Sequence, residues 1–312
     1  MLAADHALGM PRANPGAYAL GALASDTGRE RFCEAVRRGV ELIHAGDVFQ
    51  VNLTHRLRGS FRGDARSLAA DLFALAQPWY GGYLEIPAAE AGGVKRAIVS
   101  LSPELFFRFD PRSRRIVTRP MKGTRPGIAD PRTLHDSAKD SAELDMIIDL
   151  MRNDFGRMCE FGSVRVEERR TIESHAQGGL WQAVGQIAGL VRPDLGLAEI
   201  LRALFPAGSI TGAPKVRAMQ IIDELEMSPR GPYCGAFGVI LPTGEAIFNV
   251  AIRTALITGI GPDDQPGVFD EAVLEYGVGA GIVAESDPEA EWRETLDKAS
   301  MLRSITTLRD LP

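Results

Sequence analysis

The feature that most constrains the fold of this chain is a pair of adjacent apolar runs with a tight turn between them. Residues 235–241 and 246–257 are apolar, and Pro242-Thr243-Gly244 separates them. This arrangement is typical of a β-hairpin. Along the rest of the chain, hairpin patterns outnumber strand–helix–strand crossovers. The sequence therefore predicts an α+β fold of antiparallel sheets flanked by helices.

Helical periodicity marks three further segments. A helix is predicted at 65–76, a long helix at 137–159, and a final helix from Asp287-Pro288 to about residue 308. Near 49–57 the period changes to two, which indicates a strand with Gln50 on its polar face. A polar cavity and open solvent both fit that face.

Composition excludes several classes of function. The 312-residue chain has a net charge of −6 and no basic block, so nucleic acid is not an expected partner. Its three cysteines lie far apart and indicate buried thiols in a reducing compartment. No apolar run reaches membrane-spanning length and no leader pattern opens the chain, so we expect no membrane association and a cytoplasmic location.

Lys122 is the most distinctive candidate for catalysis. It lies between a Pro-Met pair and a Gly-Thr pair, which hold its backbone. If the ammonium group is partly desolvated, its pKa falls and the neutral amine becomes a nucleophile. An exposed loop lysine fits the same local pattern.

Two predicted helices carry pairs of acids at a spacing of three. Asp140 with Glu143, and Glu291 with Glu294, each project from one helix face, and Lys298 shares the face of the second pair. Solvated helix faces explain each pair alone. Facing one another, the pairs would form an all-oxygen site for a hard cation such as Mg²⁺.

Three more features indicate recognition of a small acidic molecule. A glycine-bearing loop at 208–215 leads into a helix start, which favours either anion binding or a plain capped turn. Arg253 lies inside the predicted apolar strand 246–257, where it needs a carboxylate, either from a ligand or from a structural ion pair. Glu104 has apolar neighbours, and burial would raise its pKa towards that of a general acid.

At these residues the chain resembles the chorismate-utilising enzymes. The matching segments cover the chain from about residue 26 onward and are 46–52, 100–104, 119–124, 137–143, 149–154, 205–214, 252–254, 279–281 and 291–298. The resemblance implies two intertwined subdomains like those of anthranilate synthase component I, with the site in the cleft between them. It also implies a loose segment at 1–25 and a chorismate-binding catalytic domain at 26–312. Family members are longer at the N-terminus, so we expect a short form or a fragment.

Lys122 resembles the aminodeoxychorismate synthase branch of the family, since anthranilate synthases carry alanine there. The resemblance implies that Lys122 adds to ring carbon 2 of chorismate while Glu104 protonates the hydroxyl group leaving carbon 4. Ammonia then enters at carbon 4 and expels the lysine. Gln50, where water-activating relatives carry lysine, favours ammonia over water as the nucleophile.

The resemblance also implies the ligands of the site. Glu143 and Glu294 would bind Mg²⁺, with Asp140 and Glu291 in support. The expected substrate contacts are Gln50, Thr124, Tyr233, Arg253, Gly279, Gly281 and Lys298. The match places Gln182 where relatives carry a histidine, with His175 shifted upstream, which leaves a histidine role open.

No cysteine lies in a nucleophile turn with partner His and Glu residues, so we expect no glutaminase in this chain. The resemblance implies that ammonia comes from a separate glutamine amidotransferase subunit or from free solution. Two alternatives stay open. One is an anthranilate synthase component I, and the other is a non-catalytic chorismate-binding subunit.

Overall fold

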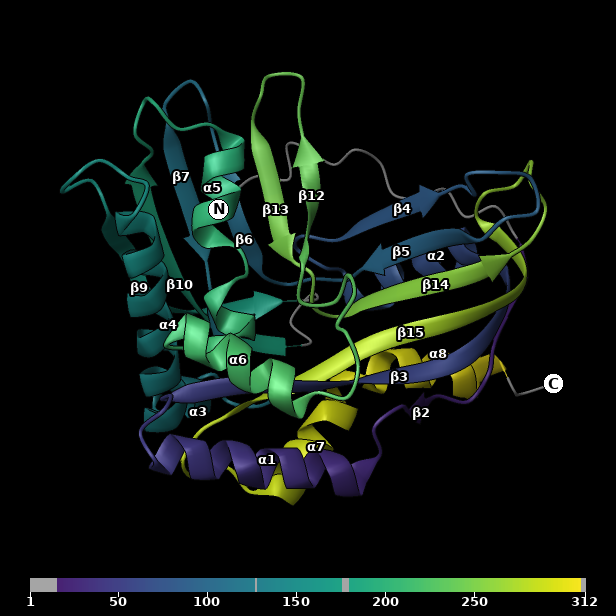
Figure 1. The fold of residues 1–312 in the computed structure, drawn as a ribbon, viewed down its shortest axis with the longest axis horizontal. Coiled ribbons are helices and arrows are strands. Elements are labelled where there is room, and N and C mark those ends of the chain that lie inside the picture. Colours follow the sequence, from purple (N-terminus) through teal and green to yellow (C-terminus); the bar gives the residue numbers. More distant parts are fainter. Residues whose placement is uncertain (1–15, 127, 176–179, 310–312) are drawn as a thin grey trace.

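The computed structural model describes residues 16–126, 128–175 and 180–309. Within them, two antiparallel sheets stand side by side with helices around them (Figure 1). The predicted α+β architecture is confirmed. No helix in the described ranges is long and apolar enough to cross a membrane.

The larger sheet has eight described strands in the order β1-β3-β15-β14-β5-β4, with β2 and β11 also paired to β3. Its strands are β1 (Tyr18–Leu20), β2 (Ala24–Ser25), β3 (Gln50–Asp64), β4 (Gly82–Ile86), β5 (Lys95–Ser100), β11 (Gly212–Ala213), β14 (Thr254–Ile260) and β15 (Val268–Ile282). The two longest strands, β3 and β15, pair along almost their whole length. They carry several of the candidate site residues.

The smaller sheet has seven described strands in the order β12-β13-β6-β7-β10-β8, with β9 also paired to β10. Its strands are β6 (Leu105–Phe109), β7 (Arg115–Arg119), β8 (Met121–Pro126), β9 (Arg165–His175), β10 (Leu180–Leu190), β12 (Ala236–Ile240) and β13 (Ala246–Val250). The hairpin predicted around Pro242-Thr243-Gly244 is β12 and β13, and it is confirmed.

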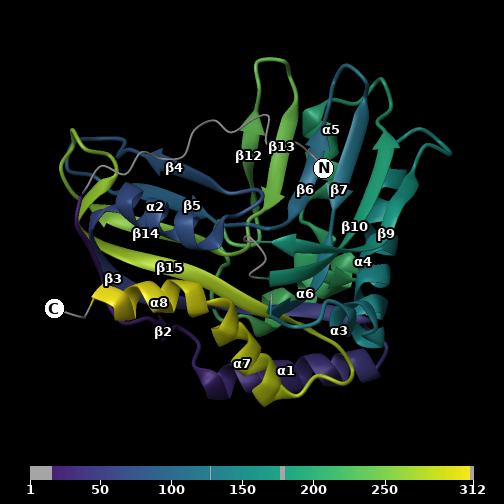
Figure 2. The same cartoon turned by 180° about the vertical axis from the view of Figure 1, so that it is seen from behind.

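The described helices are α1 (Arg29–His44), α2 (Ala65–Ala76), α3 (Arg132–His135), α4 (Ala138–Gly156), α5 (Leu197–Leu204), the 3₁₀ turn η1 (Gly208–Ile210), α6 (Lys215–Leu225), α7 (Pro288–Lys298) and α8 (Ser300–Arg309). Helix α4 packs on β8, β9 and β10, whereas α6 packs on β3 and α7 on β15. Helices α1 and α7 lie against each other along one end of the molecule in both views (Figures 1 and 2).

The predicted long helix at 137–159 is α4. The Ser137 hydroxyl accepts a hydrogen bond from the Asp140 amide, which caps the first turn and starts the helix at Ala138. One side of α4 carries fully buried apolar residues that join it to the core of the smaller sheet: Leu144, Ile147, Ile148, Met151 and Phe155. Asp140 and Glu143, in the first two turns of the same helix, are half-buried.

Two boundaries differ from the expectations. The ordered fold begins before residue 26, because β1 and β2 pair with β3 and so part of the segment expected to be loose belongs to the larger sheet; residues 1–15 lie outside the described ranges. The final helix is two helices, because α7 ends at Lys298 and α8 begins at Ser300. Ala299 and Leu302, buried next to that break, join α8 to the core of the larger sheet.

The intertwining of the two subdomains follows from the strand order. The chain forms β1 to β5 in the larger sheet and then the strands of the smaller sheet, interrupted by the two-residue strand β11, which pairs with β3. It returns to the larger sheet with β14 and β15. Besides the excursion to β11, it therefore crosses between the sheets after β5 and again after β13. The three cysteines, Cys33, Cys159 and Cys234, are buried and free, as expected.

Candidate active site

The crossing after β5 and the crossing after β13 lie against each other. The Leu101 amide donates to the Arg253 carbonyl at 3.0 Å, and the Val250 amide donates to the Glu104 carbonyl at 3.1 Å. The Ser102 hydroxyl adds a bond of 2.6 Å to the Val250 carbonyl. Glu104 and Arg253, far apart in the sequence, therefore come from neighbouring backbone segments.

Arg253 is not inside a strand, and that expectation was wrong. The apolar run 246–257 is divided into β13 and β14, which belong to different sheets, and Arg253 occupies the bend between them with a left-handed φ of 50°. The chain must turn here to leave one sheet and enter the other. Half-buried Arg253 has no carboxylate within ion-pair distance among the described residues, so a structural ion pair there does not explain it.

Glu104 is buried, with 4% of its surface exposed. Burial raises the pKa of its carboxyl group to about 7, against opposing effects of a hydrogen bond from Ser209 and of the charge of Lys122. The expected rise in the pKa of Glu104 is confirmed. Ser209 is a contact that sequence reasoning missed, although it lies in the glycine-bearing loop that the sequence singled out.

Lys122 lies on strand β8 and not on an exposed loop. Its Nζ atom is 3.3 Å from Oε2 of Glu143, and only 16% of each side chain is exposed. The following residue, Gly123, has a φ of 74°, and a Cβ atom there would lie 2.9 Å from the carboxyl group of Asp140. Lysine and both α4 acids are therefore brought together by the packing of β8 on α4.

Alternate residues of β15 are glycines at the place where other elements approach it. A Cβ atom on Gly281 would lie 3.0 Å from both Nε2 of Gln50 and Nζ of Lys122. A Cβ atom on Gly277 would lie 2.1 Å from the ring of Tyr233. The bare face of β15 thus accepts side chains from β3, from β8 and from the segment before β12.

Two buried glutamines have unsatisfied amides. Gln50 and Gln182 are both 0% exposed, and neither the nitrogen nor the oxygen of either amide has a hydrogen-bond partner among the described residues. Leaving buried polar groups unpaired costs about 1–3 kcal/mol for each group. Such orphaned amides in a native core are accounted for by a ligand or by water. Gln50 meets Lys122 at Gly281, which places its amide at the candidate site.

Gln182 lies on β10, opposite Thr124 of β8 and beside an irregularity in the pairing of these two strands. Thr124, expected to contact substrate, is exposed. The side chain of His175 lies outside the described part of the chain. The role of Gln182 or His175 therefore stays open.

The second pair of acids lies on α7. Glu294 is exposed and forms an ion pair with Lys298 at 2.7 Å, as their shared helix face predicts. Lys298 also donates to the Gly279 carbonyl at 2.7 Å. Glu291 is buried and accepts a hydrogen bond of 2.7 Å from Ser286.

The acids of α4 and α7 approach the same part of β15. Lys122, paired with Glu143, contacts Gly281, and Lys298, paired with Glu294, binds the carbonyl of Gly279. In the described ranges no three His, Cys, Asp or Glu side chains gather as a ready metal site. Mg²⁺ takes only one or two protein carboxylates together with water and substrate oxygens, so this oxygen donor set fits the ion chemically.

The glycine-bearing loop pairs with the strand that carries Gln50. Residues Gly212 and Ala213 form β11, which pairs with Val51 and Gln50 of β3. The Lys215 ammonium is bound by the buried carboxylate of Asp154 at 2.5 Å and is not available to a ligand. The loop therefore fixes the backbone of Gln50, while its expected anion binding stays a prediction.

Comparison with known proteins agrees with the fold. A family model described as chorismate binding enzyme matches residues 3–304. Aminodeoxychorismate synthase component 1 of Escherichia coli is 40% identical over 285 residues, covering 89% of this chain and 58% of that protein. Anthranilate synthase component 1 of Aquifex aeolicus is 38% identical over 281 residues, covering 88% of this chain and 52% of that protein.

The crystal structure of anthranilate synthase component I from Streptococcus pneumoniae has a similar fold. Its TM-score is 0.75 at 29% sequence identity, covering 90% of this chain and 59% of that one. The chain belongs to the chorismate-binding enzyme family. It spans 58% of the length of the E. coli relative that it matches.

Proposed function

We propose that this chain is component I of an aminodeoxychorismate synthase, which replaces the hydroxyl group on carbon 4 of chorismate by an amino group. The observation that carries the proposal is the placement of Lys122 against Gly281 and Gln50, with the buried acid Glu104 within its electrostatic reach. Relatives of that name, 40% identical in E. coli, support the choice.

The proposed reaction has two displacement steps. The Lys122 amine forms a bond to ring carbon 2, both conjugated ring double bonds shift by one position, and the hydroxyl group leaves carbon 4 as water with the proton of Glu104. Ammonia then bonds to carbon 4, both double bonds shift back, and the Lys122 amine leaves carbon 2. The additional proton on the new amino group returns to the Glu104 carboxylate. Chorismate and ammonia thus give 4-amino-4-deoxychorismate and water. A carboxyl group with a pKa of about 7 carries a proton near neutral pH and can supply it.

Recognition of the substrate is assigned to the groups around β15. Arg253, which has no described carboxylate partner, would bind one substrate carboxylate with Tyr233 and the backbone near Gly279 and Gly281. The unpaired amide of Gln50 would hydrogen-bond the substrate, and Lys298 and Thr124 would lie at the edge of the site. A neutral amide is a poor base for water, so Gln50 favours ammonia as the nucleophile.

Mg²⁺ is part of the proposal. Glu143 and Glu294 would hold it, with Asp140 and Glu291 in support. Asp140 is itself paired with Arg125 at 2.7 Å. When bound, the ion would neutralise the ring carboxylate of the substrate.

Ammonia is proposed to come from a glutamine amidotransferase subunit. The designation of the relatives as component 1 supports a partner chain of this kind. Free ammonium ions at high concentration would replace that partner in the test tube.

Product analysis tests the proposal against its alternatives. The pure chain is incubated with chorismate, MgCl₂ and ammonium chloride, and the products are separated and identified by mass. We expect 4-amino-4-deoxychorismate. Anthranilate with pyruvate would overturn this assignment in favour of anthranilate synthase, which relatives at 38% identity keep as the second candidate. Chorismate loss no faster than with Glu143→Ala would favour a non-catalytic subunit.

The covalent step has its own test. Chorismate is added without ammonia, the enzyme is quenched, and its peptides are analysed by mass spectrometry for an adduct on Lys122. A Lys122→Ala variant should lack the adduct and turn over more slowly, with some activity left because ammonia can attack carbon 4 directly. Equal turnover by the two proteins would exclude a role for the amine.

A further inference from the structure

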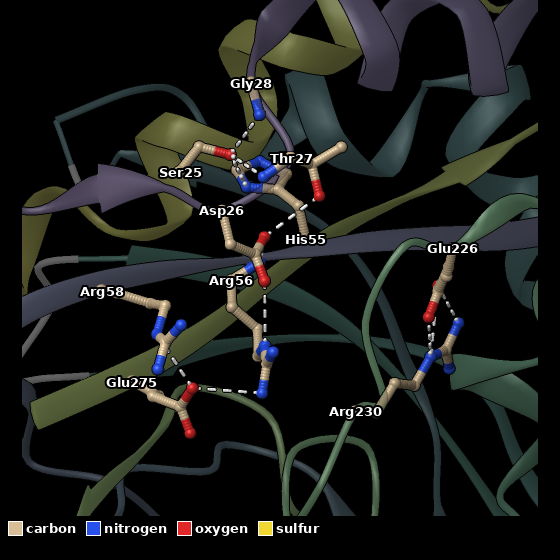
Figure 3. Close-up of polar contacts among 10 residues, drawn as sticks. All are labelled: Ser25, Asp26, Thr27, Gly28, His55, Arg56, Arg58, Glu226, Arg230 and Glu275. Carbon is tan, nitrogen blue, oxygen red and sulfur yellow. Dashed lines mark hydrogen bonds and ion pairs between the residues drawn. The ribbon is translucent and has the colours of Figure 1, made fainter.

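A largely buried arginine joins the elements that surround the site. Arg230, in the segment after α6, donates through Nη1 to the Ile210 carbonyl at 2.7 Å and through Nη2 to the Asn52 carbonyl at 2.8 Å. It also forms a two-pronged pair with Glu226, at 2.9 Å from Nε to Oε2 and 2.6 Å from Nη2 to Oε1 (Figure 3). Only 14% of the Arg230 side chain and 7% of the Glu226 side chain are exposed.

Glu226 makes the connection rigid from the other side. Its Oε1 atom accepts a hydrogen bond of 2.9 Å from the Thr54 amide. The pair therefore holds β3 at two points, Asn52 and Thr54, and holds η1 at Ile210. Ser209, whose side chain lies near enough to the Glu104 carboxyl to lower its pKa, directly precedes Ile210.

Packing alone does not explain this pair. Bringing two charges out of water costs several kcal/mol per ion, and well-packed apolar residues of similar volume are often at least as stabilising. The pair instead fixes the orientation of its partners, because the planar guanidinium group presents several donors in a fixed geometry. Here these donors bind two separate backbone segments and one carboxylate at the same time.

We propose that Arg230, held by Glu226, is a positioning residue that fixes η1 against β3 and thereby keeps the Ser209 hydroxyl near the Glu104 carboxyl. This inference rests on the proposed role of Glu104 as the acid. Arg230 itself does not touch the substrate.

The proposal has a signature in the pH dependence of activity. The charged group that acts on Glu104 is Lys122 of β8, and the hydrogen-bonding group is Ser209 of η1; both lower the pKa of Glu104. If Ser209 moves away, its stabilisation of the carboxylate is lost and the pKa of Glu104 rises. The acid then keeps its proton to higher pH, so the alkaline limb of the activity profile moves upward.

The test measures chorismate consumption against pH for four proteins: the unchanged chain, Arg230→Gln, Ser209→Ala and the double variant. We expect kcat/KM at neutral pH to fall about 10- to 100-fold for Arg230→Gln through misplacement. Its alkaline limb should move upward as far as that of Ser209→Ala. The double variant should show no further movement, because both changes break the same connection. Arg230→Lys, which keeps the charge but not the fixed geometry of the donors, should not restore the limb.

Arg202→Gln is the matched control, since Arg202 pairs with Glu199 on the exposed surface of α5. This variant should change neither kcat/KM nor the alkaline limb of the pH profile. An unmoved alkaline limb in Arg230→Gln, or additive movements in the double variant, would overturn the proposal. If Arg230→Gln does not fold, Arg230→Lys against Ser209→Ala gives the same comparison.

Failure of the proposed function is read separately. The proton on Glu104 can be titrated without turnover, by infrared difference spectra of each protein against the same protein carrying Glu104→Gln. If Arg230 positions Ser209 but the chain does not aminate chorismate, the titration of Glu104 would still move in Arg230→Gln. If the chain aminates chorismate but that titration does not move, the proposed function would stand and the positioning role of Arg230 would be excluded.

Discussion

Gly281 is the residue on which the setting of Lys122 most directly depends. The strand β15 pairs with β3 at this point, opposite Asn52, and has no side chain to separate it from the lysine. The ammonium group and the Gln50 amide both lie where a Cβ atom would begin to crowd them. Adding one methyl group at Gly281 therefore tests whether the close approach of Lys122 to β15 matters for the reaction or only for packing.

Gly281→Ala is predicted to impair activity much more than stability. The new methyl group would lie 3.0 Å from Nζ of Lys122, the far end of a flexible side chain that can move away. The free energy of unfolding should change by less than about 1 kcal/mol. The displaced amine should lower kcat/KM for chorismate about 10- to 100-fold. Urea denaturation and initial rates measure the two quantities.

Gly156→Ala is the control for that substitution. Gly156 ends α4, and nothing lies within 4 Å of the position that its Cβ atom would take. This variant should be as active as the unchanged chain. A Gly281→Ala protein with full activity would show that the closeness of Lys122 to β15 has no bearing on the reaction.

Helix α7, which carries Glu291 and Glu294, is held by a buried histidine of the neighbouring strand. His55 of β3 bonds Thr295 of α7 at 2.9 Å and Ser25 of β2 at 3.0 Å, and its ring stacks on Trp292 with centroids 4.8 Å apart. These bonds accept a neutral ring, and Figure 3 shows Ser25 beside it. Burial lowers the pKa of His55 to about 4, although the charge of Asp26 acts in the opposite direction.

This neutral histidine predicts a loss of stability in mild acid. In the unfolded chain a histidine binds a proton near pH 6.5, whereas His55 in the folded chain binds one only near pH 4. The unfolded state therefore takes up the proton first as the pH falls. The contribution of His55 to the free energy of unfolding is fully present above pH 6.5. It falls by roughly 3 kcal/mol as the pH drops from about 6.5 to 4.

The measurement is the free energy of unfolding at several pH values for the unchanged chain and for His55→Gln. Glu104 contributes with the opposite sign, because a raised pKa in the folded state favours folding at lower pH. The difference between the two proteins isolates His55. This difference in the free energy of unfolding should be independent of pH above pH 7 and should change with pH below it. His135→Gln, at an exposed histidine, should leave the pH dependence unchanged. An unaltered pH dependence in His55→Gln would exclude the buried neutral ring as its cause.

For the molecule as a whole, local sequence patterns predicted the helices and strands well. They predicted poorly where the chain passes from one sheet to the other. Helix α2 occupies the expected residues 65–76, and α4 begins next to its Ser137 cap. The apolar run 246–257 gave no sign that it serves two sheets, because each half has strand periodicity and the bend at Arg253 depends on what the sheets require. Likewise, the raised pKa of Glu104 followed from its apolar neighbours, whereas its contact with Ser209 arises only from tertiary packing.

The order of strands makes a final prediction about cooperativity. The larger sheet is completed only by β14 and β15, which follow all strands of the smaller sheet in the chain. The hydrogen bonds between the crossings, such as that from Ser102 to the Val250 carbonyl, belong to both sheets. We therefore expect the two subdomains to unfold together. Chains longer than 150 residues often populate intermediates, so a single transition is a demanding outcome.

The three tryptophans of the chain allow the test. Trp181 lies on β10 of the smaller sheet, and Trp292 lies on α7, which packs on the larger one. One variant keeps only Trp181 and another only Trp292, with phenylalanine at the other two positions. Fluorescence during urea unfolding should give coincident transitions once each variant's overall stability has been measured by circular dichroism. A Trp292 transition that precedes the circular dichroism change in its own variant would show that the larger sheet opens by itself. In that case the site between the sheets would have to assemble in a separate step.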